Sequence, residues 1–366
     1  MSTQQRHVPE VGTPVRRVLF VAHSHAFGAF RVGSHHYARM LAGAGVDVVH
    51  VSTPVSTAHR LTGRIDRTAA RALPIGPHRD ADGVRHLIPR TRLPRPYGPF
   101  RIDDELDRWG IPLGFDAVLI DQPLLWDASV RDLGRRLVYR PTDLYPSGVK
   151  ATLQRQILAA ADGVVATSGE VLRALGAVSV PTLVVPNGVD PGPFASTDAA
   201  ERPPVCVYVG AIDERFDGEQ VARWARAEPG VRFLIAGPAP QRMSFPGNVE
   251  VLGPVPYDEL PALLQRARVG MLPLSDDPLN AGRSPMKLYE YLAAGLAVVA
   301  RQTPGIRAEP PAGLFTYRDS GDASPALRAA LAHTSPNTAG ADRAQAESWD
   351  AKATELTRFL RGLPHA

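Results

Sequence analysis

The feature that most constrains the fold is a rhythm of short apolar runs, separated by loops and helical segments, that occurs twice along the chain. In the first half, an apolar run at residues 15–23 precedes a glycine-containing loop, a helix at 33–45 and a second run at 46–52. Strands that alternate with helices in this way predict parallel βαβ units in a doubly wound α/β sheet. Four more runs follow in this half: "FDAVLID", "RRLVYRPTD", "DGVVATS" and "TLVVPNG".

A stretch rich in Pro, Ala and Asp interrupts the rhythm before it restarts, and 366 residues exceed what one hydrophobic core usually serves. We therefore expect an N-terminal Rossmann-like domain at 1–190, a linker at 191–204, a second Rossmann-like domain at 205–345 and a final helix at 346–366 that packs on the first domain. Such sheets bind ligands beyond the carboxyl ends of their strands. The runs of the second half are "VCVYVGAI", "VRFLIAGP", "VEVLGPV", "RVGMLPL", "LAVVARQ" and "GLFTY".

Composition excludes several classes of protein. The single cysteine, Cys206, rules out an internal disulfide and a cysteine-based zinc cluster, which fits a reducing cytoplasm. The apolar run "VLFVA" near the N-terminus is too short for a signal peptide or a membrane span. The formal net charge is +4, but no basic helix, zinc spacing or aromatic-basic RNA motif accompanies it, so we do not expect a nucleic-acid partner.

Residues 56–101 depart from the rhythm and are strongly basic. Two interpretations remain open for this excursion. It is either a solvated loop of the first domain, or a surface for anionic lipid headgroups or a phosphorylated acceptor. Against Asp66, Asp80 and Asp82, it carries Arg60, Arg64, Arg67, Arg71, Arg79, Arg85, Arg90, Arg92, Arg95 and Arg101.

The stretch "RSPMKLYEYLAAGLAVVA" at 283–300 predicts a loop, a short helix and a buried strand. Ser284 is a suitable N-cap, Pro285 fits the first helical position, and the helix is expected to stop near Gly295. Leu288, Tyr291 and Leu292 share helical spacing and form its expected inner stripe.

Two charged residues, Lys287 and Glu290, are three positions apart at the start of this helix. A helix N-terminus attracts anions, and a lysine there adds a point charge suited to phosphate oxygens. A glutamate one turn later can accept hydrogen bonds from vicinal sugar hydroxyls. The pair therefore suits a nucleoside diphosphate, with pyrophosphate near Lys287 and ribose at Glu290. The alternative is a surface pair that stabilises the helix slightly.

The same stretch resembles the donor site of GT-B glycosyltransferases, where a Pro-x-Lys-Leu-x-Glu-Tyr-x-Ala-x-Gly motif holds a nucleotide sugar. "VVPNGVD" and "LGPVPYDELPALLQRARVGMLPL" are similar to two further segments of family 4 enzymes and their relatives. The resemblance implies two Rossmann-like domains facing a central cleft, a nucleotide-sugar substrate, no cofactor and no bound metal. The expected donor-side residues are Gly210, Val255, Tyr257, Arg283, Ser284, Met286, Lys287 and Glu290.

A narrower resemblance is to glycosyltransferase family 70, the family of the xanthan-pathway β-glucuronosyltransferase. Two stretches of the first half look like the corresponding stretches of that family: "HSHAFGAFRVGSHHYARML" and "LVYRPTDLY". Those enzymes invert the anomeric centre and act on a lipid-linked oligosaccharide. The resemblance implies that Asp143 is the catalytic base; an N-cap role is the alternative. The acceptor-side candidates are His23, His25 and Arg31, the last because a guanidinium can engage two oxygens of an anion.

Two departures leave the donor and the acceptor open. Family 4 enzymes usually have a Glu eight positions before the ribose-binding Glu, where this chain has Gly282. The family 70 enzyme has Gln in place of Glu290, and Asp in place of Ala26. The alternatives to inverting transfer are a retaining family 4-like glycosyltransferase, a sugar-nucleotide epimerase and a silent GT-B binding subunit. We expect a cytoplasmic protein, with peripheral contact to the inner face of the membrane as a further candidate.

Overall fold

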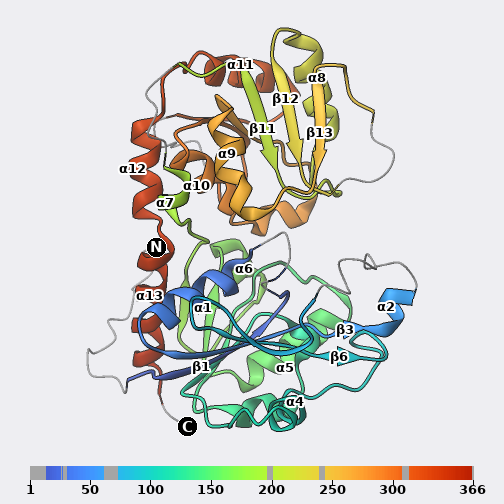
Figure 1. Ribbon diagram of the computed structural model, residues 1–366, viewed down its shortest axis with the longest axis vertical. Helices are drawn as coiled ribbons and strands as arrows, with labels where there is room; N and C mark the ends of the chain where they lie inside the picture. Colours follow the sequence, from blue (N-terminus) through green and yellow to red (C-terminus); the bar gives the residue numbers. More distant parts are fainter. Residues whose placement is uncertain are drawn as a thin grey trace. The chain divides into compact units, whose positions relative to one another are not determined.

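The computed structural model describes residues 14–364, with the exception of 26, 28–30, 62–72, 196–200, 239–243 and 307–312. Within it the chain forms two compact units. The first comprises Met1–Pro186 and Lys352–Ala366, and the second comprises Asn187–Ala351. Each unit is built on its own sheet (Figure 1).

The first sheet has eight strands in the order β10-β9-β8-β7-β1-β2-β5-β4. All neighbours pair in parallel except β4 and β5, which form an antiparallel hairpin at the edge. The strands are β1 (Arg17–Ala22), β2 (Asp47–Ser52), β4 (Gly76–Arg79), β5 (Arg85–Ile88), β7 (Ala117–Ile120), β8 (Leu137–Tyr139), β9 (Gly163–Ala166) and β10 (Thr182–Val184); β3 (Val55–Ser56) and β6 (Arg90–Thr91) pair separately.

Helices and short turns connect these strands. Ile157 of the long helix after β8 is buried in the same core cluster as Leu19 of β1 and Val118 of β7, which fixes that helix against the sheet. The elements are α1 (Gly33–Gly43), α2 (Thr57–Leu61), α4 (Ile102–Arg108), η1 (Pro123–Leu125), η2 (Ala128–Leu133), α5 (Gly148–Ala160) and α6 (Gly169–Ala174).

The second sheet has six parallel strands in the order β13-β12-β11-β14-β15-β16. The strand order reverses between β11 and β14, as in a Rossmann fold. The strands are β11 (Val205–Val209), β12 (Arg232–Ala236), β13 (Val249–Gly253), β14 (Val269–Leu272), β15 (Ala297–Arg301) and β16 (Leu314–Tyr317).

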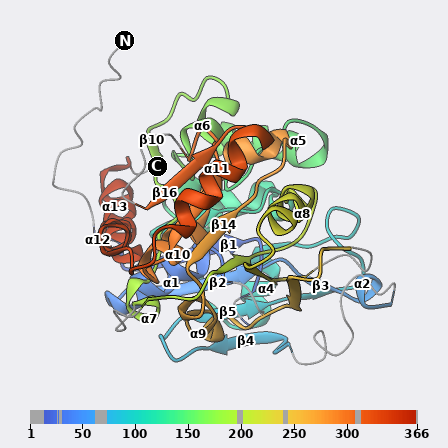
Figure 2. The ribbon, with the colours of Figure 1, turned by 90° about the horizontal axis from the view of Figure 1, so that it is seen from above.

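Alternate residues of these strands enter two separate clusters, because successive side chains point to opposite faces of a sheet. Val207 packs in one cluster with helices α9 and α10, whereas Tyr208 packs in the other with α8 and α11. The four helices are labelled in Figures 1 and 2. The helices are α7 (Pro191–Phe194), α8 (Gly218–Ala227), η3 (Tyr257–Glu259), α9 (Leu260–Gln265), η4 (Pro278–Gly282), α10 (Met286–Ala293), α11 (Ser320–Leu331), α12 (Thr338–Ala346) and α13 (Trp349–Gly362).

The structure differs from expectation at two places. The basic excursion at 56–101 contributes the β4–β5 hairpin to the first sheet; its residues Arg64, Arg67 and Arg71 lie outside the described part. The stretch expected as a linker at 191–204 begins with α7, whose Phe194 is fully buried in the core of the second unit. Its aromatic side chain therefore anchors the chain where composition indicated a loop.

Among the described residues, every helix is too short or too polar to cross a bilayer.

Candidate functional site

The switch point of the second sheet lies between β11 and β14, where ligands of such sheets bind. Gly210 directly follows β11, and the loop after β14 leads through η4 to Arg283 and then to α10. Several of the predicted donor-side residues are therefore carried by the elements that meet at this point. Their role in binding a donor stays a prediction.

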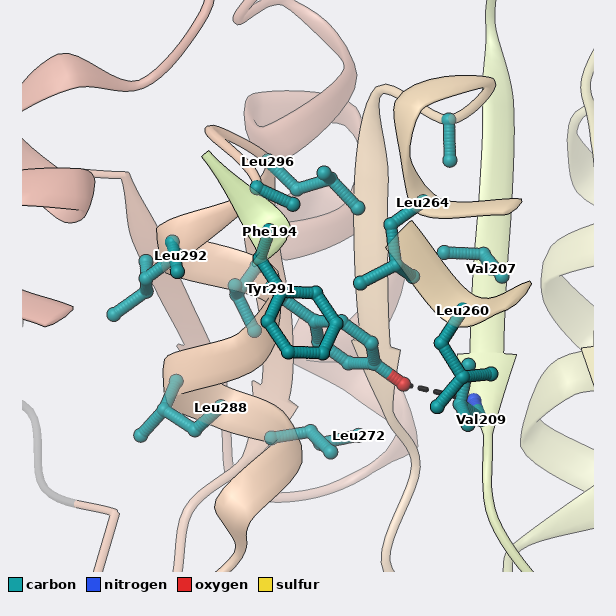
Figure 3. Packing of buried hydrophobic residues seen from close by; sticks show 14 of the residues in the cluster. Phe194, Val207, Val209, Leu260, Leu264, Leu272, Leu288, Tyr291, Leu292 and Leu296 are labelled. Atoms are coloured by element: carbon teal, nitrogen blue, oxygen red, sulfur yellow. Dashed lines mark hydrogen bonds between the residues drawn. The ribbon is translucent and has the colours of Figure 1, made fainter. Parts of the chain in front are cut away.

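Tyr291 fixes α10 against the sheet at this point. Its side chain reaches β11, where the Val209 N–H donates a hydrogen bond of 2.8 Å to the tyrosine oxygen (Figure 3). A Cβ on Gly270 of β14 would lie 2.3 Å from the Tyr291 ring, so the absence of a side chain there admits the ring. The helix is thereby held with its N-terminal turns beside the end of β11.

Two glycines bring the backbone close together at the ends of β11 and β12. Gly237 has φ +154°, and a Cβ on it would lie 1.8 Å from the carbonyl oxygen of Gly210. A Cβ on Gly210 would in turn lie 3.0 Å from Cε of Lys287. The lysine side chain therefore extends over the glycine at the carboxyl end of β11.

Lys287 and Glu290 interact on α10, as the sequence predicted. Burial lowers the pKa of the Lys287 ammonium, and the attraction of Glu290 partly offsets this effect. Glu290 is 5% exposed, and burial raises the pKa of its carboxyl group while Lys287 opposes the rise. In the described part of the chain, no hydrogen bond reaches the Glu290 carboxylate, which leaves its oxygens available to a ligand's hydroxyl groups.

Arg283, Arg215 and Asp213 complete the charged surroundings of Lys287. Arg215 Nη2 lies 2.9 Å from Asp213 Oδ2 in an ion pair. The group contains three cations and two carboxylates, Asp213 and Glu290, so it keeps a net positive charge, which favours an anionic ligand. The sequence did not identify Arg215 as a site residue, because its place beside Lys287 depends on the loop after β11 folding back toward β14.

Ser284 has a role different from the one expected. The structure makes Pro285 the N-cap of α10 and gives it no side-chain capping bond, so the predicted serine cap is wrong. The Ser284 hydroxyl instead accepts a hydrogen bond of 2.8 Å from the N–H of Asn187, and its carbonyl accepts another from Asn187 Nδ2. The long-range bonds to Asn187 replace the local cap.

The remaining donor-side candidates lie at the edges of this region. Met286 is the first residue of α10 and is half-buried. Val255 and Tyr257 pack against the core cluster, and the Tyr257 ring lies edge-on to Phe194 with 6.0 Å between ring centroids. Packing accounts for both side chains, and contact with a nucleobase stays a prediction.

The first sheet also reverses its strand order, between β1 and β7, and polar residues follow both strands. His23 follows β1 and Asp121 follows β7. Asp121 forms a bidentate ion pair with Arg140, which follows β8; the distances are 2.9 Å from Nε to Oδ1 and 2.5 Å from Nη2 to Oδ2. Both side chains are 3% exposed, and burial raises the pKa of Asp121 although Arg140 opposes the rise.

Asp143 lies three residues after Arg140 and is half-buried. His23 experiences the charges of Lys150, Asp121 and Asp143, so the structure brings the predicted base and the first predicted histidine together. Lys150 also lies with its Nζ 4.9 Å from the Tyr145 ring centroid. The sequence missed Asp121 and Lys150; the position of Asp121 directly after an apolar strand was the available signal.

His25 and Arg31 are placed beside His35, on which both exert a charge effect. His35 belongs to a group of buried histidines that the sequence did not predict. The ring centroids of His35 and His50 are 4.9 Å apart, and those of His50 and His86 are 5.3 Å apart. Burial lowers the pKa of all three imidazoles, to about 4 for His35. This group is part of the interior of the first unit.

Among the residues that the structure describes, no group of three or more His, Cys, Asp or Glu side chains is arranged to hold a metal ion. The absence of a bound metal stays a prediction. The cations around Lys287 are the groups available to balance the charge of a phosphate.

Comparisons with known proteins show which family and which relative the sequence resembles. Residues 203–333 match the family described as glycosyl transferases group 1. The chain is 27% identical over 219 residues to TuaH of Bacillus subtilis (strain 168), a protein assigned to teichuronic acid biosynthesis as a glycosyltransferase. The match covers 53% of this chain and 54% of that relative, so the chain spans about half the length of the curated relative it matches.

Solved structures share the fold over nearly the whole chain. Sucrose-phosphate synthase from Thermosynechococcus elongatus has a TM-score of 0.68 at 16% identity, covering 94% of this chain and 98% of that one. HepE of Anabaena, solved with UDP and glucose, has a TM-score of 0.64 at 16% identity, covering 95% and 100%. The fold is therefore GT-B. Within that fold, residues 203–333 of the second unit match the group 1 glycosyl transferase family.

Proposed function

We propose that this chain transfers a sugar from a nucleoside diphosphate donor to a hydroxyl acceptor. The observation that carries the proposal is the placement of Lys287 over Gly210 at the switch point of a group 1 domain, with the buried Glu290 beside it. In this arrangement the pyrophosphate binds at Lys287 and Arg283, and the ribose hydroxyls donate to Glu290. HepE was solved with UDP, which makes uridine the first base to examine.

We place the catalytic base at Asp143, and the reaction is a single displacement with inversion. The carboxylate takes the proton of the acceptor hydroxyl as its oxygen attacks the anomeric carbon, and the nucleoside diphosphate leaves with the bonding electrons. Support comes from the position of Asp143 near His23 at the carboxyl ends of β1 and β8. The resemblance of "LVYRPTDLY" to the inverting enzymes points the same way.

The charge that develops on the leaving diphosphate is balanced by Lys287, Arg283 and Arg215 and by the N-terminus of α10, without a bound metal. The acceptor is a lipid-linked sugar or another glycoconjugate precursor, for which the basic excursion at 56–101 gives a surface of suitable charge.

Hydrolysis and transfer assays test the proposal directly. The protein is first titrated with UDP by calorimetry and then incubated with a panel of UDP-sugars, with and without EDTA. We expect UDP binding and slow release of UDP from one sugar, unchanged by the chelator. The released sugar, observed early by proton NMR, should have the anomeric configuration opposite to that of the donor. Release with retained configuration would contradict inversion, and absence of UDP binding would contradict the function as a whole.

A further inference from the structure

A pocket of about 420 Å³ opens in the first unit, and its lining includes neither His23 nor Asp143. It is formed by the start of α2, by β6 and by the end of α4. The ring of Trp109 forms an apolar part of the pocket wall. The positively charged lining residues are Arg90, Arg92 and Arg108. All residues that line this pocket belong to the first unit.

The charges at this pocket are unevenly matched. Arg108 Nη1 lies 3.2 Å from Glu105 Oε1, and these two side chains neutralise each other. Arg90 and Arg92 are exposed, and neither has an ion pair with any described residue. Two guanidinium groups that lack an ion pair among the described residues line one pocket, and they favour an anionic group with several oxygens, such as a phosphodiester.

Large apolar side chains are exposed in the same short part of the chain. Leu61 at the end of α2 is 73% exposed, Leu93 is 49% exposed and Tyr97 is 79% exposed. The backbone connects them to the arginines, because the N–H of Ala58 in α2 donates to the carbonyl of Arg92 at 3.1 Å. Exposed leucine and tyrosine next to unpaired arginine is a combination typical of surfaces that sit at a membrane interface.

We propose that α2, β6 and the loop at 92–97 form a docking surface for an anionic phospholipid, whose headgroup phosphate occupies the pocket between Arg90 and Arg92. Leu61, Leu93 and Tyr97 lie at the boundary between headgroups and acyl chains. A free phosphate would contact the arginines but not the three apolar side chains. A phospholipid would contact both, and we therefore propose it as the ligand. This surface deepens the proposed function, since it holds the enzyme at a membrane that carries a lipid-linked acceptor, but its lipid binding does not depend on transfer.

Vesicle sedimentation with the full chain tests the proposal. We expect binding to vesicles of phosphatidylcholine mixed with phosphatidylglycerol, and none to phosphatidylcholine alone. Salt at about 1 M, where screening acts within about 3 Å, should release the protein. Arg90→Gln combined with Arg92→Gln should weaken partitioning by about fivefold for each charge removed. Arg226→Gln combined with Arg358→Gln removes two other exposed arginines and should have little effect.

A second variant separates a lipid surface from a simple anion site. Leu61→Ser combined with Leu93→Ser and Tyr97→Ser keeps both arginines but should weaken binding to the same anionic vesicles at least as much. Undiminished vesicle binding by this variant would overturn the lipid proposal and indicate a site for a soluble anion. Equal binding to neutral vesicles would also overturn it. Titrating every variant with UDP distinguishes failure of the lipid proposal from failure of the proposed function. A protein that binds UDP but does not bind vesicles would contradict the lipid-docking surface and leave the proposed function intact.

Discussion

Asn187 donates two hydrogen bonds to Ser284, one from its main-chain N–H to Oγ and one from Nδ2 to the carbonyl oxygen, both of 2.8 Å. They join two parts of the second unit that are 97 positions apart in the sequence, immediately before α10 begins. Because α10 carries Lys287 and Glu290, the asparagine is a positioning residue for the proposed donor site. Its contribution can be measured separately from that of the charged residues.

Asn187→Ala removes the Nδ2 hydrogen bond to the Ser284 carbonyl and keeps the main-chain one. It should reduce the affinity for UDP by about tenfold, because an unfulfilled hydrogen-bonding group costs about 1–3 kcal/mol and its loss loosens the start of α10. Calorimetry with UDP measures the effect. Asn248→Ala is the matched control, since Asn248 Nδ2 donates to the carbonyls of Ala225, Glu228 and Val231 elsewhere in the unit. The Asn248→Ala variant should lose stability but keep its UDP affinity. A similar loss of UDP affinity in the two variants would show that Asn187 only stabilises the fold.

Lys287→Ala should weaken binding of UDP more than binding of uridine, because uridine lacks the pyrophosphate. A hydrogen bond to a charged group is worth about 1.5–3 kcal/mol, so the expected loss for UDP is about ten- to a hundredfold. Glu290→Ala should weaken both ligands, since both contain the ribose. Equal losses of UDP and uridine for Lys287→Ala would show that the lysine only supports the fold.

Asp143→Asn should lower the transfer rate by about 10² to 10⁴, the usual contribution of a positioned general base, and leave UDP affinity nearly unchanged. The amide keeps the shape of the side chain but cannot take the acceptor proton. Initial rates and UDP calorimetry on the same preparation give both quantities. Asp104→Asn, which changes a carboxylate with 74% exposure, serves as the control. Near-normal turnover of the Asp143→Asn variant would exclude Asp143 as the base and favour the alternative of a retaining glycosyltransferase.

The buried histidines predict that the first unit loses stability in acid. The folded-state pKa values of His35, His50 and His86 lie below the ordinary value of 6.5, with burial as the main cause. The unfolded chain therefore binds more protons as the pH falls below 6.5, and the free energy of unfolding decreases until the folded-state values are reached, about 4 for His35. Each such histidine contributes up to about 1.4 kcal/mol per pH unit.

Hydrogen exchange of the β1 and β2 amides at pH values between 7 and 5 measures this effect. His50→Gln should reduce the pH dependence, because His50 is fully enclosed and its imidazole is repelled by His35 and His86 when charged; Arg140 also disfavours its protonation. His333→Gln, in the second unit, should leave it unchanged. A pH dependence that is the same in both variants would assign acid sensitivity to groups other than this histidine.

The strands of both sheets were predictable because central parallel strands are buried on both faces and appear as continuous apolar runs. "GPHR" and "RHLI" of the β4–β5 hairpin lack such a run, since this hairpin lies at the edge of the sheet. Lys287 and Glu290 were predictable as a pair because helical spacing alone brings them together. Asp121 and Arg140 pair across the ends of two neighbouring strands, which the sequence shows only once the order of the sheet is known.

The division of the chain has a consequence for its synthesis. The first unit contains residues up to Pro186 and also Lys352–Ala366, so its two parts are separated by the entire second unit. Leu363, in the returning part, packs against Gly163 of β9, and its carbonyl oxygen accepts a hydrogen bond from Arg136. On the ribosome, the unit that begins to emerge first is therefore completed only after the second unit has been synthesised, and β9 lacks its contact with Leu363 until then.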